Sequence, residues 1–504
     1  MPEGGDAAAP DVPTPDAAPA PARLDQVMVR GVAWTAVGRI LSQLLRWSST
    51  LLVARLLSPE DYGVMGIAAM VIEFAAIVAE FGFGAAIVQD RTLSREHVED
   101  LGGAGLLLAI ALAAACSLAS PLVAAFFRVP ALSLVVSALT LRLVLDAAST
   151  VPRSCLARDL RFKELAAMEG IEAFVSAALT LLLAWLLRSY WALAISNLVG
   201  GATLFVLAAR AYPFRLRLPR SGRGIAAQVR FGRDVILGRL VLHGYLNADF
   251  AVVGRLFDKV ALGTYTFGWN LASVPSEKLF GMLLRVIPGV LSAARARPDE
   301  MRRLYGLIVE GLALVLFPAA AGIALVADPF IETVVGAKWL PAAGPFRLLS
   351  LFFAVRAIAA AAQVVMVTQG APHVHRNYSL VFLVTLPGLF VVGAHWGLTG
   401  VAAVWILAYP ALFFALEQRW VLRSLGMRAR AFFGCLAPAA ACTALMSVVV
   451  LFTDAGLANG HPAPAVRLVV LVLAGAATYV GALRVLFPAR FRQGLTLVRR
   501  RRFA

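Results

Sequence analysis

The chain has 504 residues, of which 60% are hydrophobic and 15% are charged, and its mean hydropathy is +0.80. A soluble protein of this length does not have such a composition, so a soluble globular fold is excluded. The net charge of +17 invites a nucleic-acid interpretation, but the basic residues gather in alternate loops between apolar runs, which indicates membrane topology and not a nucleic-acid partner.

Residues 1–24 form an acidic segment that is rich in Ala and Pro. The segment lacks a basic start followed by a short apolar core, so we do not interpret it as a signal peptide. It offers little apolar surface to bury, and we therefore expect a disordered cytoplasmic tail.

Apolar runs of roughly twenty residues then recur along the chain, and each can cross about 30 Å of hydrocarbon. We count about fourteen: 34–57, 63–88, 102–126, 132–151, 168–187, 190–209, 234–254, 262–289, 305–326, 346–368, 377–394, 398–416, 432–452 and 466–487. The run 398–416 is short and the run 262–289 contains charges, so a count of twelve or thirteen stays open. The expected fold class is an all-α integral membrane protein.

One motif occurs twice, and its copies lie 200 positions apart (238 − 38, 255 − 55, 263 − 63). The first copy reads Gly38-Arg39, Val53-Ala54-Arg55-Leu56 and Gly63, and the second reads Gly238-Arg239, Val253-Gly254-Arg255-Leu256 and Gly263. Six predicted spans separate the copies, and an even number gives both halves the same orientation. Two similar halves can rock against each other around a shared site, so the repeat indicates transport.

The repeat divides the membrane part into two pseudo-symmetric six-helix lobes and two additional helices. The stretch between the lobes is rich in Arg and is broken by Pro213, Pro219, Gly222 and Gly224. The expected organisation is a tail at 1–24, an N-lobe at 25–210, a basic linker at 211–233, a C-lobe at 234–425, two extra transmembrane helices at 426–488 and a basic cytoplasmic tail at 489–504.

Basic residues are concentrated in alternate loops. One such loop carries Arg153, Arg158, Arg161 and Lys163, and the basic tail contains Arg499 to Arg502. The loops between them carry one or two basic residues each, which is the positive-inside bias and predicts that both termini are cytoplasmic. The basic rim is also expected to contact anionic membrane lipids.

The first predicted hairpin contains charges at membrane depth. Arg39 and Arg46 lie on one face of the first span, and Glu73 and Glu80 lie on one face of the second. Counted from the turn at Glu60, Arg46 matches Glu73 in depth and Arg39 matches Glu80. Each charge needs a partner or a water-filled cavity. We weigh structural ion pairs and a substrate or ion-coupling role equally for the two glutamates.

The second half is similar in plan. Arg239, His243 and Asp249 lie on one predicted span, and Glu277 and Lys278 lie on the next. We interpret His243, Asp249, Glu277 and Lys278 as ion-coupling groups or structural charge partners, with Asp249 pairing to a cation across the hairpin.

Two further arginines lie within predicted spans. Arg142 and Asp146, one turn apart, are expected to neutralise each other, whereas Arg356 has no obvious partner in its own helix. Cations are at least as numerous as carboxylates within the spans. This balance suits an anionic substrate, for which phosphate is the natural candidate because Arg binds it in a bidentate fork.

Motifs for catalysis and for cofactors are absent from the sequence. It contains no phosphate-binding loop and no His-Glu-x-x-His, Gly-x-Ser-x-Gly or Cys-x-x-Cys motif. The four cysteines, Cys116, Cys155, Cys435 and Cys442, have no metal-ligand spacing. We expect a transporter without cofactors or metal ions, and not an enzyme.

Several segments of the first half carry a family resemblance. Arg30-Gly-Val-Ala-Trp34, Leu56-Leu-Ser-Pro-Glu-Asp-Tyr-Gly63, Glu80-Phe-Gly-Phe-Gly84 with Ala86-Ile-Val-Gln89, and Leu156-Ala-Arg-Asp-Leu-Arg-Phe162 resemble bacterial polysaccharide exporters. These are the Wzx-like O-antigen, capsule and exopolysaccharide flippases of the multidrug/oligosaccharidyl-lipid/polysaccharide (MOP) superfamily. The resemblance covers roughly residues 25–425.

The resemblance implies a V-shaped, MATE-like pair of six-helix bundles. It implies a lipid-linked oligosaccharide substrate on undecaprenyl diphosphate, moved from the cytoplasmic to the periplasmic leaflet of the bacterial inner membrane, with coupling to an ion gradient or to the membrane potential. On this basis Arg39, Arg46, Arg239 and Arg356 would line a cavity facing the diphosphate. A polysaccharide polymerase and glycosyltransferases of the same pathway are expected as further partners.

Three alternatives stay open. The two C-terminal helices resemble those of lipid II flippases. A drug/cation antiporter of the same superfamily would use carboxylates such as Glu73, Glu80 and Asp249, although neighbouring arginines would compete for them. A membrane polysaccharide polymerase usually needs a longer periplasmic loop than the predicted loop at about 327–345.

Overall fold

The computed structural model describes residues 48–80, 83–89, 93–214, 236–283, 287–295, 297–458, 460 and 462–492, without the side chains of 85, 89, 275–283 and 458. The predictions for the tail at 1–24, for most of the linker at 211–233 and for most of the basic tail at 489–504 fall outside these residues. So do those for Arg39 and Arg46. The division into lobes therefore stays a prediction.

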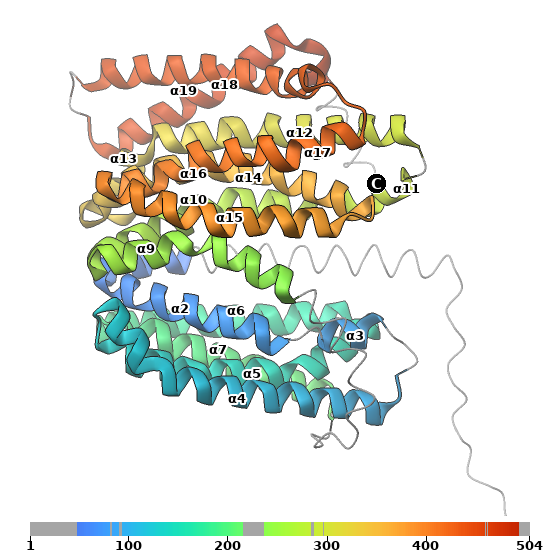
Figure 1. Ribbon diagram of the computed structural model, residues 1–504. Helices are drawn as coiled ribbons and strands as arrows, with labels where there is room; N and C mark the ends of the chain where they lie inside the picture. Colours follow the sequence, from blue (N-terminus) through green and yellow to red (C-terminus); the bar gives the residue numbers. More distant parts are fainter. Residues whose placement is uncertain are drawn as a thin grey trace, which may run out of the picture.

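The first half forms a bundle of antiparallel helices, which we call the first bundle (Figure 1). It contains a helical stretch at 48–56, α2 (Pro59–Glu80), α3 (Phe83–Gln89), α4 (Arg95–Phe127), α5 (Ala131–Arg158), α6 (Phe162–Leu187) and α7 (Trp191–Ala211). Ser94 caps α4 by accepting a hydrogen bond from the His97 amide. Arg128 and Arg188 end α4 and α6 in the left-handed conformation, which turns the chain sharply.

The second half forms the second bundle, which lies against the first with its helices nearly parallel to them (Figure 1). It contains a helix at Ile236–Leu246, α9 (Ala248–Leu256), α10 (Lys259–Leu283), α11 (Ile287–Ala293), α12 (Pro298–Leu325), α13 (Ala327–Phe330), the π-helix η1 (Ile331–Val335), the 3-10 helix η2 (Ala337–Ala342), α14 (Ala343–Thr368), α15 (Pro372–Gly393), η3 (Ala394–Trp396), α16 (Gly397–Phe413), the π-helix η4 (Phe414–Gln418) and α17 (Arg419–Ser424). The helices α18 (Ala429–Ala458) and α19 (Pro464–Leu486) pack on the outer side of this bundle, against α12 (Figure 1).

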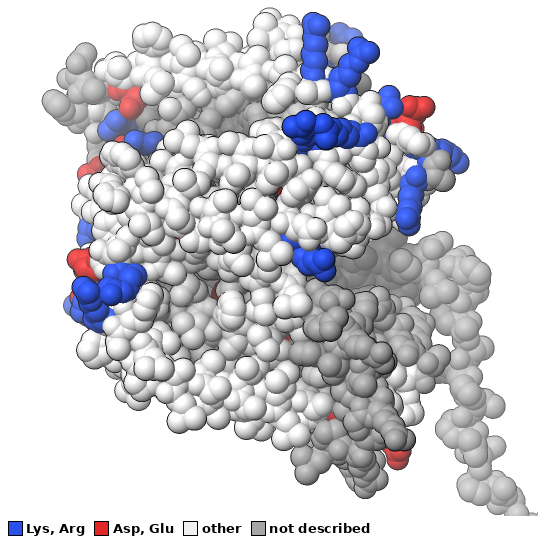
Figure 2. All heavy atoms as spheres, in the orientation of Figure 1, with Lys and Arg blue, Asp and Glu red and all other residues white. Residues whose placement is uncertain are grey.

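Among the described residues, ten helices are long and apolar enough to cross a membrane, or eleven if the bent pair Ile236–Leu246 and α9 forms one span. Leu118, Val384, Phe452 and Val485 each expose more than three quarters of their surface, as lipid-facing side chains do. In Figure 2 most of the charged side chains lie toward the two ends of the visible face, and few charged atoms are visible in the broad belt between them. The chain is thus a multi-pass membrane protein, while the number fourteen stays a prediction.

Several predicted boundaries differ from the described helices. The run 132–151 is part of a longer helix, because α5 continues to Arg158 and so includes Arg153, which we had assigned to a loop. The short run 398–416 belongs to a continuous helical stretch that extends through η4 and α17 to Ser424. A span predicted from apolar residues ends at the first charged residue. A helix can continue beyond that residue when its charged side chains find partners.

Candidate functional site

The two bundles meet at one end through the repeated motif itself. The start of α2 packs on the start of α10, and Gly63 of the first copy lies against Gly263 of the second. A Cβ atom on Gly263 would overlap the Pro59 carbonyl group and would lie 2.7 Å from the Gly63 amide nitrogen. Lys259 also forms an ion pair with Glu60. The repeated glycines therefore let two helix backbones approach each other, as small residues do in membrane helix pairs.

The repeated arginines also reach across this contact. Arg55 donates hydrogen bonds to the carbonyl oxygens of Thr333 at 2.6 Å and Val334 at 2.9 Å, in the second bundle. Arg255 reaches the opposite way, and its guanidinium lies 5.5 Å from the ring centroid of Phe126 at the end of α4. We call this joined end, formed by 54–63, 255–263 and 333–339, the closed end.

Two residues of η2 complete the closed end. Lys338 donates to the carbonyl oxygens of Arg55 at 2.8 Å and Leu57 at 2.7 Å, where the helical stretch 48–56 ends. A cation suits the carbonyl end of a helix. The Trp339 indole donates to the Ala54 carbonyl at 2.8 Å and is fully buried. These bonds join side chains of the second bundle to main-chain carbonyl groups of the first.

Away from the closed end, α2 forms a wall of three cavities. The largest, about 940 Å³, lies within the first bundle and carries charged residues, namely Glu80, Arg142, Asp146, Arg153, Glu169 and Glu172. The second, about 520 Å³, lies between the bundles just beneath the closed end, where Glu73 and three asparagines line it. We call these the charged cavity and the central cavity.

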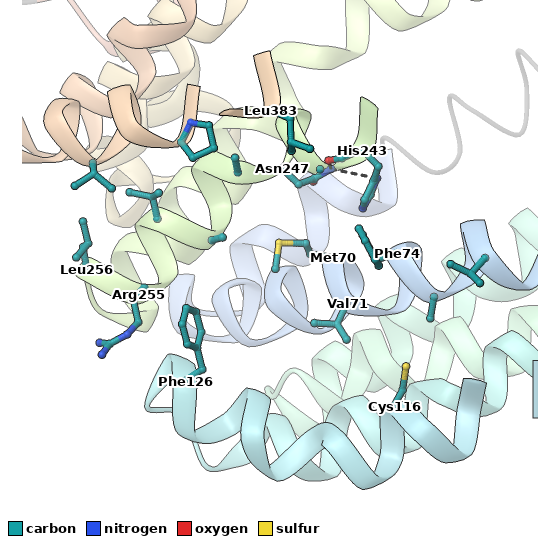
Figure 3. A pocket seen from close by; sticks show the side chains of 18 of the residues that line it. Met70, Val71, Phe74, Cys116, Phe126, His243, Asn247, Arg255, Leu256 and Leu383 are labelled. Atoms are coloured by element: carbon teal, nitrogen blue, oxygen red, sulfur yellow. Dashed lines mark hydrogen bonds between the residues drawn. The ribbon is translucent and has the colours of Figure 1, made fainter. Parts of the chain in front are cut away.

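The third cavity is apolar and lies on another face of α2. It has a volume of about 730 Å³ and is lined by α2, α4, α9 and α15, with Met70, Phe74 and Leu383 among its lining residues (Figure 3). We call it the apolar cavity. It extends along the seam between the two bundles, opposite the charged cavity across α2.

The cations of the charged cavity are held in place by neighbouring groups. Arg142 donates from Nε to both Asp146 oxygens, at 2.9 and 3.0 Å, which confirms the predicted pair. Its Nη1 also donates to the Asn197 carbonyl at 2.7 Å, so Arg142 joins α5 to α7. Arg153 lies 3.7 Å from Glu169. Sequence reasoning missed Arg153 as a cavity residue because it falls beyond the apolar run.

The predicted binding cation Arg239 joins the two bundles. Its Nη1 donates to Oε2 of Glu80 at 2.6 Å, and both side chains are about half exposed. This pair lies toward the opposite end of α2 from the closed end. Depth counting within one hairpin had matched Glu80 with Arg39, which is not described; the described partner of Glu80 comes from the other bundle.

Charge reversal tests this pair. Glu80→Arg and Arg239→Glu each place like charges across the seam, and each is expected to lower export of the cargo about fivefold, the size of effect typical of half-exposed ion pairs. The double reversal restores the attraction and should return export to within about twofold of wild type. A double variant no better than the poorer single would show that the two residues act separately.

His243 lies at the bend between the helix Ile236–Leu246 and α9. The Asn247 amide donates to the His243 carbonyl oxygen at 2.9 Å, and this side-chain bond accompanies a 41° bend between the two helices. The His243 ring faces Phe74 of α2, with ring centroids 6.0 Å apart (Figure 3). Both residues line the apolar cavity, so His243 lies at the seam.

Asp249 lies inside the second bundle and is fully buried. Its Oδ2 accepts hydrogen bonds from the Tyr265 hydroxyl at 2.7 Å and the Trp405 indole at 2.8 Å, and Oδ1 accepts one from the Phe250 amide. Among the described residues, neutral donors therefore satisfy this carboxyl group, and the cation across the hairpin stays a prediction.

The remaining predicted residues are separated from the cavities or lie outside the description. Arg356 is half-buried in α14, with its guanidinium 5.6 Å from the Phe353 ring centroid, and it lines none of the three cavities. The side chains of Glu277 and Lys278 are not described, and neither are Arg39 and Arg46. Their binding roles stay predictions.

Comparison with known proteins supports one family. The family model described as "Polysaccharide biosynthesis protein" matches residues 52–344. The teichuronic acid biosynthesis protein TuaB of Bacillus subtilis (strain 168) is 22% identical over 471 residues, which cover 93% of this chain and 97% of TuaB. The succinoglycan biosynthesis transport protein ExoT of Rhizobium meliloti (strain 1021) is 24% identical over 334 residues, 65% of this chain and 66% of ExoT.

The fold is also that of a solved structure. The structure of the lipid II flippase MurJ in an inward closed conformation superposes with a TM-score of 0.72 at 13% identity, and the match covers 90% of this chain and 99% of that chain. At this identity the likeness concerns the fold alone. The chain is therefore a multi-pass membrane protein with the fold of a solved transporter, and it belongs to the family whose model is described as "Polysaccharide biosynthesis protein".

Proposed function

We propose that this protein moves a lipid-linked oligosaccharide, carried on undecaprenyl diphosphate, from the cytoplasmic to the periplasmic leaflet of the bacterial inner membrane. The observation that carries the proposal is the placing of a charged cavity and an apolar cavity on two sides of α2. A lipid-linked sugar is amphiphilic. Its head group needs charged and polar partners, and its polyprenyl chain needs an apolar surface beside them.

The charged and central cavities suit the head group. Arg142 and Arg153 supply guanidinium groups, which bind phosphate in a bidentate fork, and the carboxylates and asparagines accept and donate hydrogen bonds to sugar hydroxyls. The apolar cavity suits the first isoprene units of the lipid, because its lining is formed almost entirely by aliphatic and aromatic side chains. The rest of the chain would remain in the bilayer.

Alternating access would follow from the repeat. The closed end is formed by equivalent residues of both halves, so a rocking motion can separate them while the two bundles stay intact. In this proposal the N- and C-lobes correspond to the first and second bundles, fourteen helices cross the membrane and both termini are cytoplasmic. The closed end then faces the periplasm, and the cavities load from the cytoplasm.

A deletion strain tests the proposed function. Loss of the protein is expected to leave unpolymerised lipid-linked units on the cytoplasmic leaflet, measured by a membrane-impermeant sugar-modifying reagent in intact and in permeabilised cells. Units on the periplasmic leaflet would indicate a polymerase, and an unchanged sugar profile would indicate a drug antiporter. A block in peptidoglycan precursor transport would indicate a lipid II flippase.

The apolar cavity offers a matched pair of substitutions on α15. Leu383 lines the cavity, whereas the neighbouring Val384 is 77% exposed on the lipid-facing surface. Leu383→Trp fills part of the cavity and should lower export about tenfold, since a bulky ring displaces the lipid chain. Val384→Trp should leave export unchanged. Equal effects of both variants, at equal protein levels, would remove the apolar cavity from the lipid path.

A further inference from the structure

A group of buried polar side chains lies inside the second bundle, apart from all three cavities. Glu417 is completely buried in η4, and Gln418 beside it is 1% exposed. His375, near the start of α15, contacts Glu417 through Nδ1 and Oε1 at 2.9 Å. The Tyr305 hydroxyl of α12 donates to Gln418 Oε1 at 2.9 Å. None of these residues serves the proposed head-group or lipid sites.

The hydrogen bonding of this group is incomplete. Glu417 Oε2 and Gln418 Nε2 are buried and have no hydrogen-bond partner among the described residues. Buried polar atoms are nearly always paired, so an unpaired carboxylate oxygen calls for an explanation. An ionised carboxylate with a bare oxygen is costly at membrane depth, and a protonated carboxyl group in the same place costs much less.

Among the described residues, few charges face Glu417. The titratable groups near it are His375 from α15, Tyr245 from the helix Ile236–Leu246, Tyr305 from α12 and Tyr409 from α16. Arg356 of α14 interacts electrostatically with Tyr245 and Tyr409, but its guanidinium lies by the Phe353 ring and forms no described ion pair with Glu417. Arg419 of α17 is exposed. A proton is therefore the simplest way to neutralise the His375–Glu417 pair.

The local backbone also distinguishes this position. Residues 414–418 form a π-helix between α16 and α17, and such short insertions are frequent at functional sites. The extra residue of a π-turn rotates the side chains that follow, which can turn a charged residue near a helix end inward. The other described π-helix, η1, provides a reference, because its glutamate, Glu332, is exposed.

We propose that His375 and Glu417 form a proton-binding site that couples a proton to transport. When the imidazole is neutral and the carboxylate is ionised, the pair carries one negative charge. Uptake of one proton makes the pair neutral. The His375 side chain is 20% exposed, so water can deliver this proton. The bond joins the start of α15 to the residues that follow α16. Since α15 also lines the apolar cavity, a change in this bond can alter the seam.

Infrared difference spectroscopy tests the site in the purified full-length protein, in nanodiscs without substrate. Spectra recorded at high and low pH should contain a carboxyl signal that is lost in Glu417→Gln and altered in His375→Gln. The control Glu332→Gln should retain it. Glu417→Gln keeps the shape and a hydrogen bond to His375, so folding is expected to persist, as checked by size-exclusion chromatography. A Glu417→Gln spectrum identical to wild type would overturn the proposal.

Coupling rests on the proposed function and is measured separately. In proteoliposomes that contain lipid-linked oligosaccharide, a pH gradient should accelerate wild-type movement about tenfold, while Glu417→Gln should show no acceleration and retain the slow movement. Full acceleration in Glu417→Gln would overturn the coupling. If wild type moves no lipid-linked sugar, the proposed function fails, and the spectra still decide whether the pair binds a proton.

Discussion

Gly263→Val is expected to abolish export and to prevent the closed end from forming. A Cβ atom at this position would overlap the Pro59 carbonyl group, and the clash is with main-chain atoms that cannot rotate away. Overpacking a well-packed site typically costs about 1–3 kcal/mol, and a backbone clash belongs at the upper end of that range. The variant should therefore favour separation of α2 from α10. Export of sugar and accessibility of a cysteine introduced at Thr266 to an impermeant thiol reagent give the two measurements.

Gly388→Val is the matched control for this substitution. Gly388 lies within α15, and a Cβ atom there would meet nothing within 4 Å. The same change in helix propensity thus occurs without the clash. If Gly388→Val impairs export as strongly as Gly263→Val, the effect belongs to helix propensity and not to the closed end.

Arg46→Ala is expected to lower export about a hundredfold while the protein still accumulates in the membrane. The predicted depth of Arg46 matches Glu73, and Glu73 lines the central cavity beneath the closed end. A guanidinium at this depth can hold a phosphate group in a bidentate fork, and its loss removes a charge-assisted contact. A hundredfold loss corresponds to ~2.7 kcal/mol. Export is measured against the amount of protein by immunoblot.

The double variant Arg46→Ala/Glu73→Ala separates binding from folding. If Arg46 mainly neutralises Glu73, the double variant should recover membrane levels that either single variant loses, because no lone charge remains buried. If Arg46 binds substrate, membrane levels stay normal in the single variant and export stays low in both. Full export by Arg46→Ala at normal protein levels would remove Arg46 from the site.

The repeat in the sequence predicted more than the presence of two similar halves. It identified the residues that join the bundles, since Arg55, Gly63, Arg255 and Gly263 all lie at the closed end. The sequence predicted a shared site from this repeat but could not show that the repeated residues make the contact themselves. Equivalent positions in a twofold arrangement meet only near the axis, and the position of the axis depends on packing between distant helices.

The sequence predicts charge pairs within one helix more readily than pairs between distant helices. The pair Arg142 and Asp146 is four residues apart and follows from helix geometry alone. The partner of Glu80 comes from another bundle, 159 residues away, and no local period encodes it. Asp249 similarly draws its donors from α10 and α16, where aromatic side chains supply neutral hydrogen bonds that hydropathy does not register.

Charged residues just beyond the apolar runs were the main omission. Arg153 and Glu417 each follow a predicted span, and the boundary placed them in loops. In the structure Arg153 lines the charged cavity and Glu417 is fully buried. Both helices continue because the bundle interior supplies partners, and Glu417 itself lies in the π-helix η4. A single-chain hydropathy pattern contains neither kind of information.

The central claim is that the two bundles carry a lipid-linked oligosaccharide through the cavities around α2. The most direct measurement uses the purified protein in vesicles that contain fluorescent undecaprenyl-diphosphate oligosaccharide, with a quencher that reaches one leaflet only. The account predicts rapid loss of the protected pool with the wild type and slow loss with Leu383→Trp and Gly263→Val. A wild-type rate equal to that of empty vesicles, from protein whose fold and insertion are intact, would contradict it.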